Sequence, residues 1–434
     1  MEPTLAVIGL SYRTSPVAVR ERFWIGASGR YEALHHLLRS EGIDEAIVLA
    51  TCNRTEFILW ANDVPAAANS VLRLLTHDYQ LKLCDWSHFY RLMDDVAFTH
   101  IFQVAAGLDS AVVGEPEISN QMREAWQQAR SVGATGRFLD AVIHKTLAVS
   151  ARVRKETSIG DSRLTFPSAA VELAIGVLGD LAGSEVLLLG AGRMSEVAGK
   201  CLRKAGAGRL KVINRTQSKA DELAYKLGAK SVAWDDRLAQ LKTADVVVCT
   251  TSSPSNMIGF EEAKAVARAR QQKPIVVIDI AVPRNVDPRA GEIDGVFLFD
   301  MDGLEEVIRR DPTLQHTATD AANKIVAEEV QGFRRRLSAE RAVPTIVALR
   351  RRLEDLCQQE VDFLRQEFGP FTEEQDDILT TLAAHITQRI ASSLARELRE
   401  PPDRTGQDVL TVAVQRLFRL EKPGLVETGQ ENCQ

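Results

Sequence analysis

The segment from Glu185 to Asp300 limits the possible folds more than any other part of the chain. Short apolar runs alternate there with stretches of helical period, and the runs are EVLLLG, LKVIN, SVAW, DVVVCTT, IVVIDIAV and GVFLFD. Apolar strands that are separated by helices are typical of a parallel sheet with helices on both faces. The pattern therefore predicts a doubly wound, Rossmann-like α/β domain.

The first of these strands leads into a turn that is typical of dinucleotide sites. After EVLLLG the chain reads Gly190, Ala191, Gly192, Arg193, Met194 and Ser195, and a helical stretch follows. The first glycine permits a tight turn, and the second allows a pyrophosphate to approach the free N–H groups of the helix. Ser195 replaces the usual third glycine without blocking the phosphate. A plain tight turn is the alternative, and the strand–turn–helix context favours a nucleotide site.

The end of the second strand bears on the choice of cofactor. Asn214 and Arg215 stand where an NAD site would have an acidic residue for the ribose 2′-hydroxyl. Arg215 could instead pair with a 2′-phosphate, helped by Ser218 and Lys219. The alternative is a solvated arginine at the end of a strand. We expect NADPH rather than NADH.

The chain differs in character on the two sides of this segment. Residues 1–160 mix strand and helix patterns, which predicts an α+β catalytic domain. After Asp300 only helical periods remain, with breaks expected at Pro344, Gly369-Pro370 and Pro401-Pro402. The predicted division is therefore 1–160, 161–305 with a connecting helix at Phe166–Leu181, an all-helical domain at 306–420, and a disordered tail at 421–434.

Composition and charge exclude several classes of protein. With 45% hydrophobic and 26% charged residues, and no apolar run of the ~18 residues that a span needs, an integral membrane protein is excluded. The start of the chain lacks the basic and apolar regions of a secretory signal, so we expect a cytoplasmic protein. The 53 Lys and Arg against 59 Asp and Glu give a net charge of −6, so any contact with RNA must come from local basic patches.

The cysteines predict reduced thiols and no metal site. Six cysteines, at positions 52, 84, 201, 249, 357 and 433, show neither a close pair nor zinc spacing. Cys52 follows an apolar strand, and if that strand continues, Cys52, Arg54 and Glu56 point to one side. A cation beside a cysteine lowers its pKa and makes the thiolate a nucleophile toward a carbonyl. The alternative is a small buried residue beside a surface arginine.

A second polar cluster follows at 107–110 and 114–121, between apolar helical stretches. Its glycines and polar residues suggest a loop that lines a site. His100 precedes it in VAFTHIFQV and could donate a proton to a leaving oxygen at neutral pH. On the residues alone, a satisfied and semi-buried histidine is the alternative.

Several stretches together resemble the glutamyl-tRNA reductases over nearly the whole chain. They are GLSYRTSPVAVRERF, ATCNRTE, AAGLDSAVVGEPEISNQ, ARVRKETSIG, LLLGAGRMSE, VINRT and IDIAVPRNVDP. The resemblance implies three domains along a long spinal helix: a catalytic domain, an NADPH domain and a helical dimerisation domain that gives a V-shaped homodimer.

The resemblance also implies a reaction. Cys52 would attack the α-carbonyl of glutamate on tRNA(Glu), release the tRNA and leave a thioester, which NADPH would reduce to glutamate-1-semialdehyde. This is the first step of five-carbon tetrapyrrole (porphyrin, haem) biosynthesis. His100 would be the histidine that the family needs for activity. Because the ester is already activated and a thioester accepts hydride better than a carboxylate, neither ATP nor a metal is required.

The same resemblance assigns the substrate site. Arg54 would hold the γ-carboxylate and Ser110, Glu115 and Gln121 the rest of the glutamyl group, and the predicted site also includes Thr51, Asn53, Pro116 and Glu117. Three positions depart from the family pattern: Tyr12 replaces histidine, Glu117 glutamine and Asn120 glycine. An anion at Glu117 within ~6 Å of the substrate carboxylate would weaken binding unless protonated or turned away. The alternative function is a non-catalytic paralogue that binds glutamyl-tRNA as a dimeric scaffold or regulator.

The helical third suggests partners. Apolar residues recur every three or four positions in 343–364 and in 376–396, which predicts packing between these helices, a dimer core, or both. Arginines at 334–336 and 350–352, with Arg152, Arg154 and Lys155, are the predicted contacts for tRNA phosphates, with a solvated helix face as the alternative. The resemblance further implies transfer of the aldehyde to glutamate-1-semialdehyde aminomutase.

Overall fold

The computed structural model describes residues 3–159, 165–251, 253, 256–309, 316–399 and 404–420. The chain divides into two compact units, Met1–Ala327 and Glu328–Gln434. The first unit contains two sheets, which we call the antiparallel part (3–159) and the parallel part (165–309). The tail predicted at 421–434 and the break predicted at Pro401-Pro402 lie outside the described residues.

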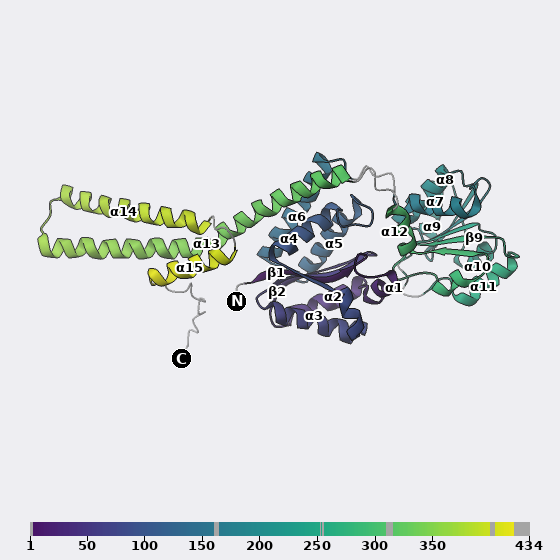
Figure 1. Ribbon diagram of the computed structural model, residues 1–434, viewed down its shortest axis with the longest axis horizontal. Helices are drawn as coiled ribbons and strands as arrows, with labels where there is room; N and C mark the ends of the chain where they lie inside the picture. The colour runs from purple at the N-terminus through teal and green to yellow at the C-terminus, as the bar shows by residue number, and fades with distance from the viewer. Residues whose placement is uncertain are drawn as a thin grey trace. The chain divides into compact units, whose positions relative to one another are not determined.

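The antiparallel part is an α+β fold around a four-stranded sheet in the order β2-β3-β1-β4. The strands are β1 (Thr4–Ser11), β2 (Ile43–Ala50), β3 (Arg54–Ala61) and β4 (Tyr90–Met93). Figure 1 shows helices on both faces of this sheet: α4 (Asp94–Ala106), α5 (Glu117–Ser131) and α6 (Arg137–Glu156) on one, α2 (Ala27–Leu38) and α3 (Val64–Tyr79) on the other. Every residue of β1 is buried, because both faces of this central strand are covered.

The parallel part is the predicted doubly wound fold. Its six strands pair in parallel in the order β10-β9-β8-β5-β6-β7. They are β5 (Glu185–Leu189), β6 (Arg209–Ile213), β7 (Lys230–Ser231), β8 (Val246–Cys249), β9 (Ile275–Asp279) and β10 (Val296–Phe299). The order reverses between β5 and β8, and nucleotides bind at the carboxyl ends of strands beside such a reversal.

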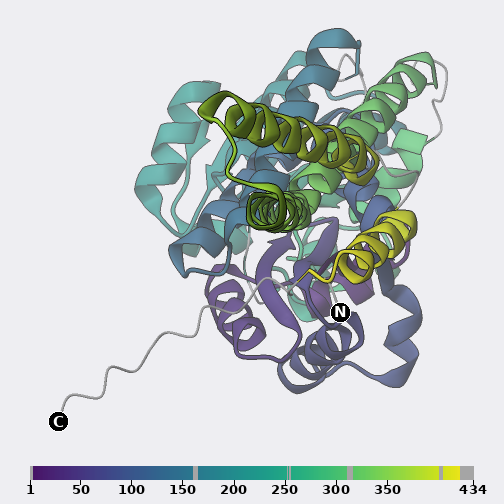
Figure 2. The same ribbon diagram turned by 90° about the vertical axis from the view of Figure 1, so that its left-hand side faces the viewer.

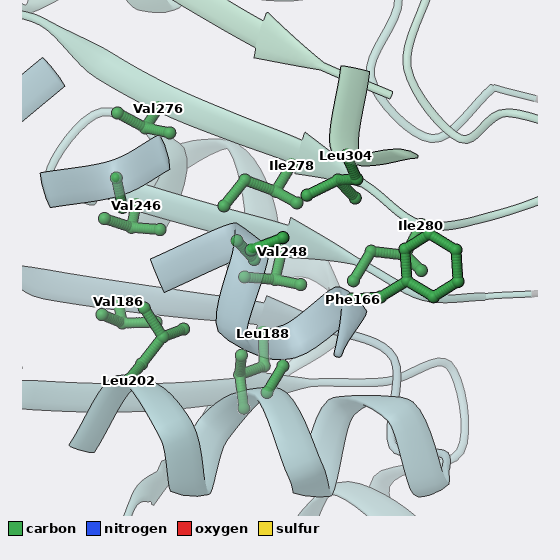
Figure 3. Packing of buried hydrophobic residues seen from close by; sticks show 14 of the residues in the cluster. Phe166, Val186, Leu188, Leu202, Val246, Val248, Val276, Ile278, Ile280 and Leu304 are labelled. Carbon is green, nitrogen blue, oxygen red and sulfur yellow. The ribbon is translucent and has the colours of Figure 1, made fainter. Parts of the chain in front are cut away.

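Side chains that alternate along the strands fill two cores, one on each face of the parallel sheet. Val186 and Leu188 pack with α7 (Phe166–Leu178), α8 (Arg193–Lys204), α9 (Gln217–Leu227) and α12 (Met301–Arg309), as Figure 3 shows for part of this cluster. Leu187 and Leu189 pack with α10 (Arg237–Leu241) and α11 (Phe260–Ala269). The helix expected to connect domains at Phe166–Leu181 is thus α7, and it packs within the core of the parallel part.

Short helices complete the first unit. They are α1 (Val17–Arg20), η1 (Glu21–Phe23), η2 (Leu83–His88), η3 (Trp234–Asp236) and η4 (Pro288–Glu292). Of these, α1 and η1 belong to the antiparallel part but contact the parallel part through side chains: Arg20 of α1 bonds α12, and Glu21 of η1 bonds Arg284.

The second unit is helical, as predicted. It contains most of α13 (His316–Phe368), with α14 (Glu373–Arg399) and α15 (Arg404–Leu417). Figures 1 and 2 show α14 returning alongside the second half of α13. The break at Gly369-Pro370 is confirmed. The break at Pro344 is wrong, because the residues that flank this proline, Ala342 and Leu349, are buried against α14 and α15 and keep the helix continuous.

The described residues leave part of the apolar face of α14 exposed. Ala391, Ala395 and Leu398 face the core of the second unit. In contrast, the exposed fractions of Ile378 and Leu382 are 61% and 54%, and Ile386 and Ile390 are also exposed. The predicted packing between the two helices is therefore confirmed through Ala391 and Leu398, which cluster with Leu349 and Leu353 of α13, but the four exposed residues take no part in it.

Candidate active site

Cys52 lies in the hairpin turn between β2 and β3, not on a continuing strand. The Thr51 hydroxyl oxygen accepts the N–H groups of Asn53 at 3.1 Å and Arg54 at 3.2 Å, and the Thr51 N–H donates to the Arg54 carbonyl. The strand ends at Ala50 because these bonds close the turn. Strand alternation therefore applies to Arg54 and Glu56, which share one face of β3, and not to Cys52.

The surroundings of Cys52 keep its sulfur neutral in this state. The residue is half-buried and packs against the apolar core that includes Val112 and Phe166. The pKa of the Cys52 thiol is raised to about 12, mainly by burial, with Glu115 contributing to the rise and Arg20 opposing it. The expectation that Arg54 lowers this pKa is wrong, because the guanidinium of Arg54 is engaged elsewhere.

Arg54 is held between two carboxylates. Its Nη1 donates to Glu56 Oε1 at 2.7 Å, and its Nη2 donates to Asp109 Oδ2 at 3.0 Å and to the Asp109 carbonyl. Asp109 also accepts from the more exposed Arg13. Although burial opposes its charge, Glu56, Tyr90 and Asp109 raise the pKa of Arg54 above its ordinary value. The Asp109 carboxylate thus already occupies the Arg54 guanidinium, which we expected to bind the γ-carboxylate of the substrate.

His100 belongs to the same buried network. Its Nε2 lies 2.8 Å from Glu56 Oε1, and the Tyr90 hydroxyl donates to that same oxygen. Burial alone would raise the pKa of Glu56, but His100 and Arg54 hold it well below its usual range. Glu56 is therefore a buried carboxylate anion that gathers three donors.

The loop before α5 and the start of α8 enclose a mainly apolar cavity of about 320 Å³. Of the predicted substrate residues, Glu115, Pro116, Glu117 and Gln121 line it; of the predicted cofactor residues, Arg193 and Met194 do. Glu117 Oε2 accepts from Arg193 Nη1. The side chain of Glu117, one of the three departures from the family pattern, thus bonds the first residue of α8. Burial raises the pKa of Glu115 to about 7, Glu117 adds to the rise and Arg193 opposes it.

A second cavity of about 350 Å³ lies at the carboxyl ends of β5 and β6. Gly190, Ala191, Gly192, Asn214 and Arg215 line it, together with Lys219, Thr250 and Ser253. Gly190 has φ of 119°, and a Cβ there would meet the Thr250 hydroxyl oxygen at 2.6 Å, so this turn requires glycine. A Cβ on Gly192 would meet nothing within 4 Å, which leaves this backbone open to a ligand. The residues fit a dinucleotide.

The remaining predicted residues lie outside both cavities. Ser195 is buried and its hydroxyl bonds that of Thr250. Thr51, Cys52, Asn53 and Arg54 form the turn and network described above, and Ser110 is buried in the loop that follows α4. Sequence reasoning missed the roles of Tyr90 and Asp109. One available signal was the carboxylate Glu56, which is followed by the apolar run FILWA in its strand and therefore needs buried partners.

Several other expectations concern metals, membranes and RNA. Within the described ranges, no group of three or more His, Cys, Asp and Glu side chains is placed to bind a metal ion. No helix in the described part of the chain is both long and apolar enough to cross a membrane.

Arginines of the predicted tRNA patches pair along their own helices: Arg152 with Glu156, Arg336 with Glu340 and Arg350 with Glu354.

Fold and site together define the class of protein. A parallel domain with a dinucleotide turn adjoins a domain with a candidate cysteine nucleophile, and the two line one cavity. The chain is an oxidoreductase of the dehydrogenase type that uses a nicotinamide cofactor.

Comparisons with known proteins give the family. Residues 8–157 match the N-terminal domain of glutamyl-tRNAGlu reductase, 172–307 match shikimate/quinate 5-dehydrogenase, and 321–420 match the glutamyl-tRNAGlu reductase dimerisation domain. The glutamyl-tRNA reductase of Solibacter usitatus is 35% identical over 96% of this chain and 99% of its own, and that of Geobacter sulfurreducens is 34% identical over 96% of each. A solved structure, the glutamyl-tRNA reductase from Methanopyrus kandleri, is 27% identical with a TM-score of 0.50, over 96% of this chain and 99% of that one. The chain belongs to the glutamyl-tRNA reductase family.

Proposed function

We propose that this protein reduces glutamyl-tRNA(Glu) to glutamate-1-semialdehyde with NADPH, through a thioester on Cys52. Family membership over almost the whole chain supports the overall reaction. One structural observation carries the proposal: the loop that holds Glu115 and the turn that begins α8 line the same cavity. An acyl group and a nicotinamide must meet for reduction, and this arrangement brings their candidate binding loops together.

In the acylation step, the Cys52 sulfur bonds to the α-carbonyl carbon of the glutamyl ester. The bond between that carbon and the ribose oxygen of tRNA breaks, and the proton lost by the thiol is balanced by the proton that the ribose oxygen gains. His100 is the proposed proton donor to that oxygen. When bound, NADPH supplies the hydride that reduces the resulting thioester to the aldehyde.

The substrate itself offers a way to activate the thiol. The α-ammonium is the cationic group of the glutamyl moiety, and Glu115 is the carboxylate that, after burial, contributes most to the raised pKa of Cys52. An ion pair between them would cancel the negative charge that now disfavours the thiolate. Substrate binding would thus lower the pKa of Cys52 from its resting value of about 12.

The contacts of Asp109 support a proposed binding mode for the γ-carboxylate. It accepts from Arg54 and Arg13 together, so this pair of guanidinium groups already holds a carboxylate. The substrate carboxylate would replace Asp109 at Arg54, and Ser110 and Gln121 would complete the pocket with Thr51, Asn53, Pro116 and Glu117.

Arg215 and Lys219 support NADPH over NADH. Both line the cavity beside the glycine turn, and Arg215 Nη2 donates to Ser253 Oγ at 3.1 Å. Strand β6 ends at Ile213, and Asn214-Arg215 follow it without the carboxylate that would bind a free 2′-hydroxyl. Arg215 is therefore the proposed ligand of the 2′-phosphate, and Gly190–Ser195 would hold the pyrophosphate.

We also propose a homodimer through the second unit. The exposed stripe of Ile378, Leu382, Ile386 and Ile390 on α14 is the surface that a second copy would cover. The arginine patches at 334–336 and 350–352, with Arg152, Arg154 and Lys155, would contact tRNA phosphates. A transient complex with glutamate-1-semialdehyde aminomutase would receive the reactive aldehyde.

The test uses NADPH oxidation with charged and uncharged tRNA. We expect oxidation and aldehyde only with glutamyl-tRNA, and loss of both in Cys52→Ser. Cys84→Ser removes an exposed thiol and serves as the matched control. Normal turnover by Cys52→Ser would remove Cys52 as the nucleophile.

The raised pKa of Cys52 and the departures at Tyr12, Glu117 and Asn120 favour a second candidate, the non-catalytic paralogue. Acid quench after mixing with tRNA that carries radiolabelled glutamate separates the two functions. Label that stays attached to the protein supports the enzyme. Tight tRNA binding without attached label supports the scaffold.

A further inference from the structure

A row of three residues crosses the antiparallel sheet at the buried network. Gly9 on β1 pairs with Glu56 on β3 and with Tyr90 on β4. A Cβ on Gly9 would lie 2.8 Å from Glu56 Cγ and 2.5 Å from the Thr55 carbonyl oxygen, closer than side chains tolerate. The glycine thus leaves the room in which the Tyr90 hydroxyl reaches Glu56.

The donors around Glu56 are distributed unevenly. Oε1 accepts from Arg54 at 2.7 Å, lies 2.8 Å from the His100 ring and also accepts from Tyr90, whereas Oε2 is buried without a partner among the described residues. A buried oxygen without a hydrogen-bond donor, such as Oε2, costs free energy. The position of Glu56 is therefore explained by the three groups that bond Oε1 and not by good hydrogen bonding of the whole carboxylate.

This geometry determines the hydrogen on the His100 ring. An ionised carboxylate only accepts hydrogen bonds, so the ring nitrogen that faces it, Nε2, must carry a hydrogen. Among the described residues, no other hydrogen bond to the ring is found, and Tyr90 packs against it edge-on at 5.4 Å. Neutral His100 is therefore the Nε2–H tautomer, with its lone pair on Nδ1.

We propose that Glu56 is a positioning residue for acyl transfer, which fixes Nε2–H of His100 and leaves Nδ1 to exchange protons with the substrate. This inference rests on the proposed function. As the ester C–O bond breaks, imidazolium Nδ1–H gives its proton to the ribose oxygen, and the ring relaxes to the tautomer that Glu56 accepts. The proton lost by Cys52 restores the imidazolium, so the step is balanced.

Neutralising Arg54 does not by itself explain Glu56. Asp109 already accepts from Arg54 through both its carboxylate and its carbonyl. By comparison, Glu56 is the single hydrogen-bond partner of the His100 ring among the described residues, and 13% of the His100 side chain is exposed. The orientation of His100 therefore depends strongly on Glu56. The charge of Arg54 depends on Glu56 less, because Asp109 also compensates it.

Glu56→Gln tests the proposal, because it keeps the shape and removes the charge that dictates the tautomer. We expect acylation, measured by acid quench in a single turnover, to slow about 10- to 100-fold, by analogy with metal-binding histidines that lose the outer partner that orients them. Binding of glutamyl-tRNA and reduction of a preformed thioester should be unchanged. Tyr90→Phe is the matched control, since it removes another donor to the same oxygen and should acylate close to the wild-type rate.

The ring nitrogens of His100 give a readout that does not depend on turnover. In protein labelled with ¹⁵N-histidine, and assigned with His100→Gln, we expect the Nε2–H tautomer in the wild type and a mixture in Glu56→Gln. An Nδ1–H tautomer in the wild type would overturn the proposal even if Glu56→Gln failed to fold. Acylation by folded Glu56→Gln at the wild-type rate would also overturn it. A wild type that forms no thioester but has the expected tautomer would contradict the proposed function and not the placement of His100.

Discussion

The antiparallel and parallel parts meet through two ion-pair contacts of opposite character. At one, which we call the buried junction, Arg20 donates to Asp302 at 2.9 Å and to Glu305 at 3.2 Å, and Arg284 pairs with Glu21 at 2.6 Å. Only 2% of the Arg20 side chain is exposed. At the other, the loop contact, Glu117 pairs with Arg193, and 33% and 64% of these side chains are exposed.

The difference in exposure between the two contacts indicates which of them can break at small cost. Breaking a buried pair strands a desolvated charge and costs about 3 to 5 kcal/mol. An exposed pair is screened by water and contributes about 0 to 1 kcal/mol. The buried junction therefore fixes α1 and α12 together, whereas the loop contact, whose two residues line the shared cavity, can exchange its partners for substrate or cofactor at small cost.

The largest expected effect breaks the buried junction. Arg20→Met leaves Glu305, 3% exposed, without its buried cation and should destabilise the protein by about 3 kcal/mol in urea unfolding. Arg309→Met is the matched control, since Arg309 pairs with the same carboxylate at 3.3 Å but is 62% exposed. We expect a loss of about 1 kcal/mol or less there. Equal losses in the two variants would remove the distinction between the contacts.

A smaller effect appears in the pH dependence of stability. Burial raises the pKa of Glu305 from 4.5 to about 7, Arg20 opposes the rise and Asp302 adds to it. The folded state therefore binds more protons than the unfolded state between these values, and Glu305 should make stability fall as pH rises from about 5 to about 7.

Glu305→Gln should flatten this fall, as measured by urea unfolding at pH 5, 6, 7 and 8. The neighbouring Glu306 is exposed, so Glu306→Gln should leave the pH dependence as in the wild type. A fall that persists unchanged in Glu305→Gln would assign it to another buried acid, such as Asp279, whose pKa is also raised to about 7 by burial.

The two contacts also show what the sequence can predict. Periodicity located the parallel sheet, and the glycine turn located the second cavity, because both follow from residues adjacent in the chain. Cys52 was found from its motif, but its pKa was predicted in the wrong direction. Burial is the main cause of the rise, and the charges that modify the pKa, Glu115 and Arg20, are distant in sequence, whereas the neighbouring Arg54 is held by Asp109 from another element. Such long-range pairing has no periodic signal.

Glu117 is the sharpest example, and the smallest predicted effect concerns it. As an expected ligand of the glutamyl group, Glu117 carries an unfavourable charge, but in the structure its side chain pairs with Arg193, the first residue after the glycine turn.

Glu117→Gln should change stability by less than about 1 kcal/mol, and by freeing Arg193 for phosphate it should tighten NADPH binding about 2- to 5-fold in fluorescence titrations. Glu124→Gln removes an exposed charge from the same helix and should leave affinity unchanged. The swap of Glu117→Arg with Arg193→Glu re-forms the loop contact but places an anion beside the turn, so it should weaken binding. If the swap bound NADPH as well as Glu117→Gln does, Arg193 would have no part in cofactor binding, and the loop contact would be a surface pair without consequence.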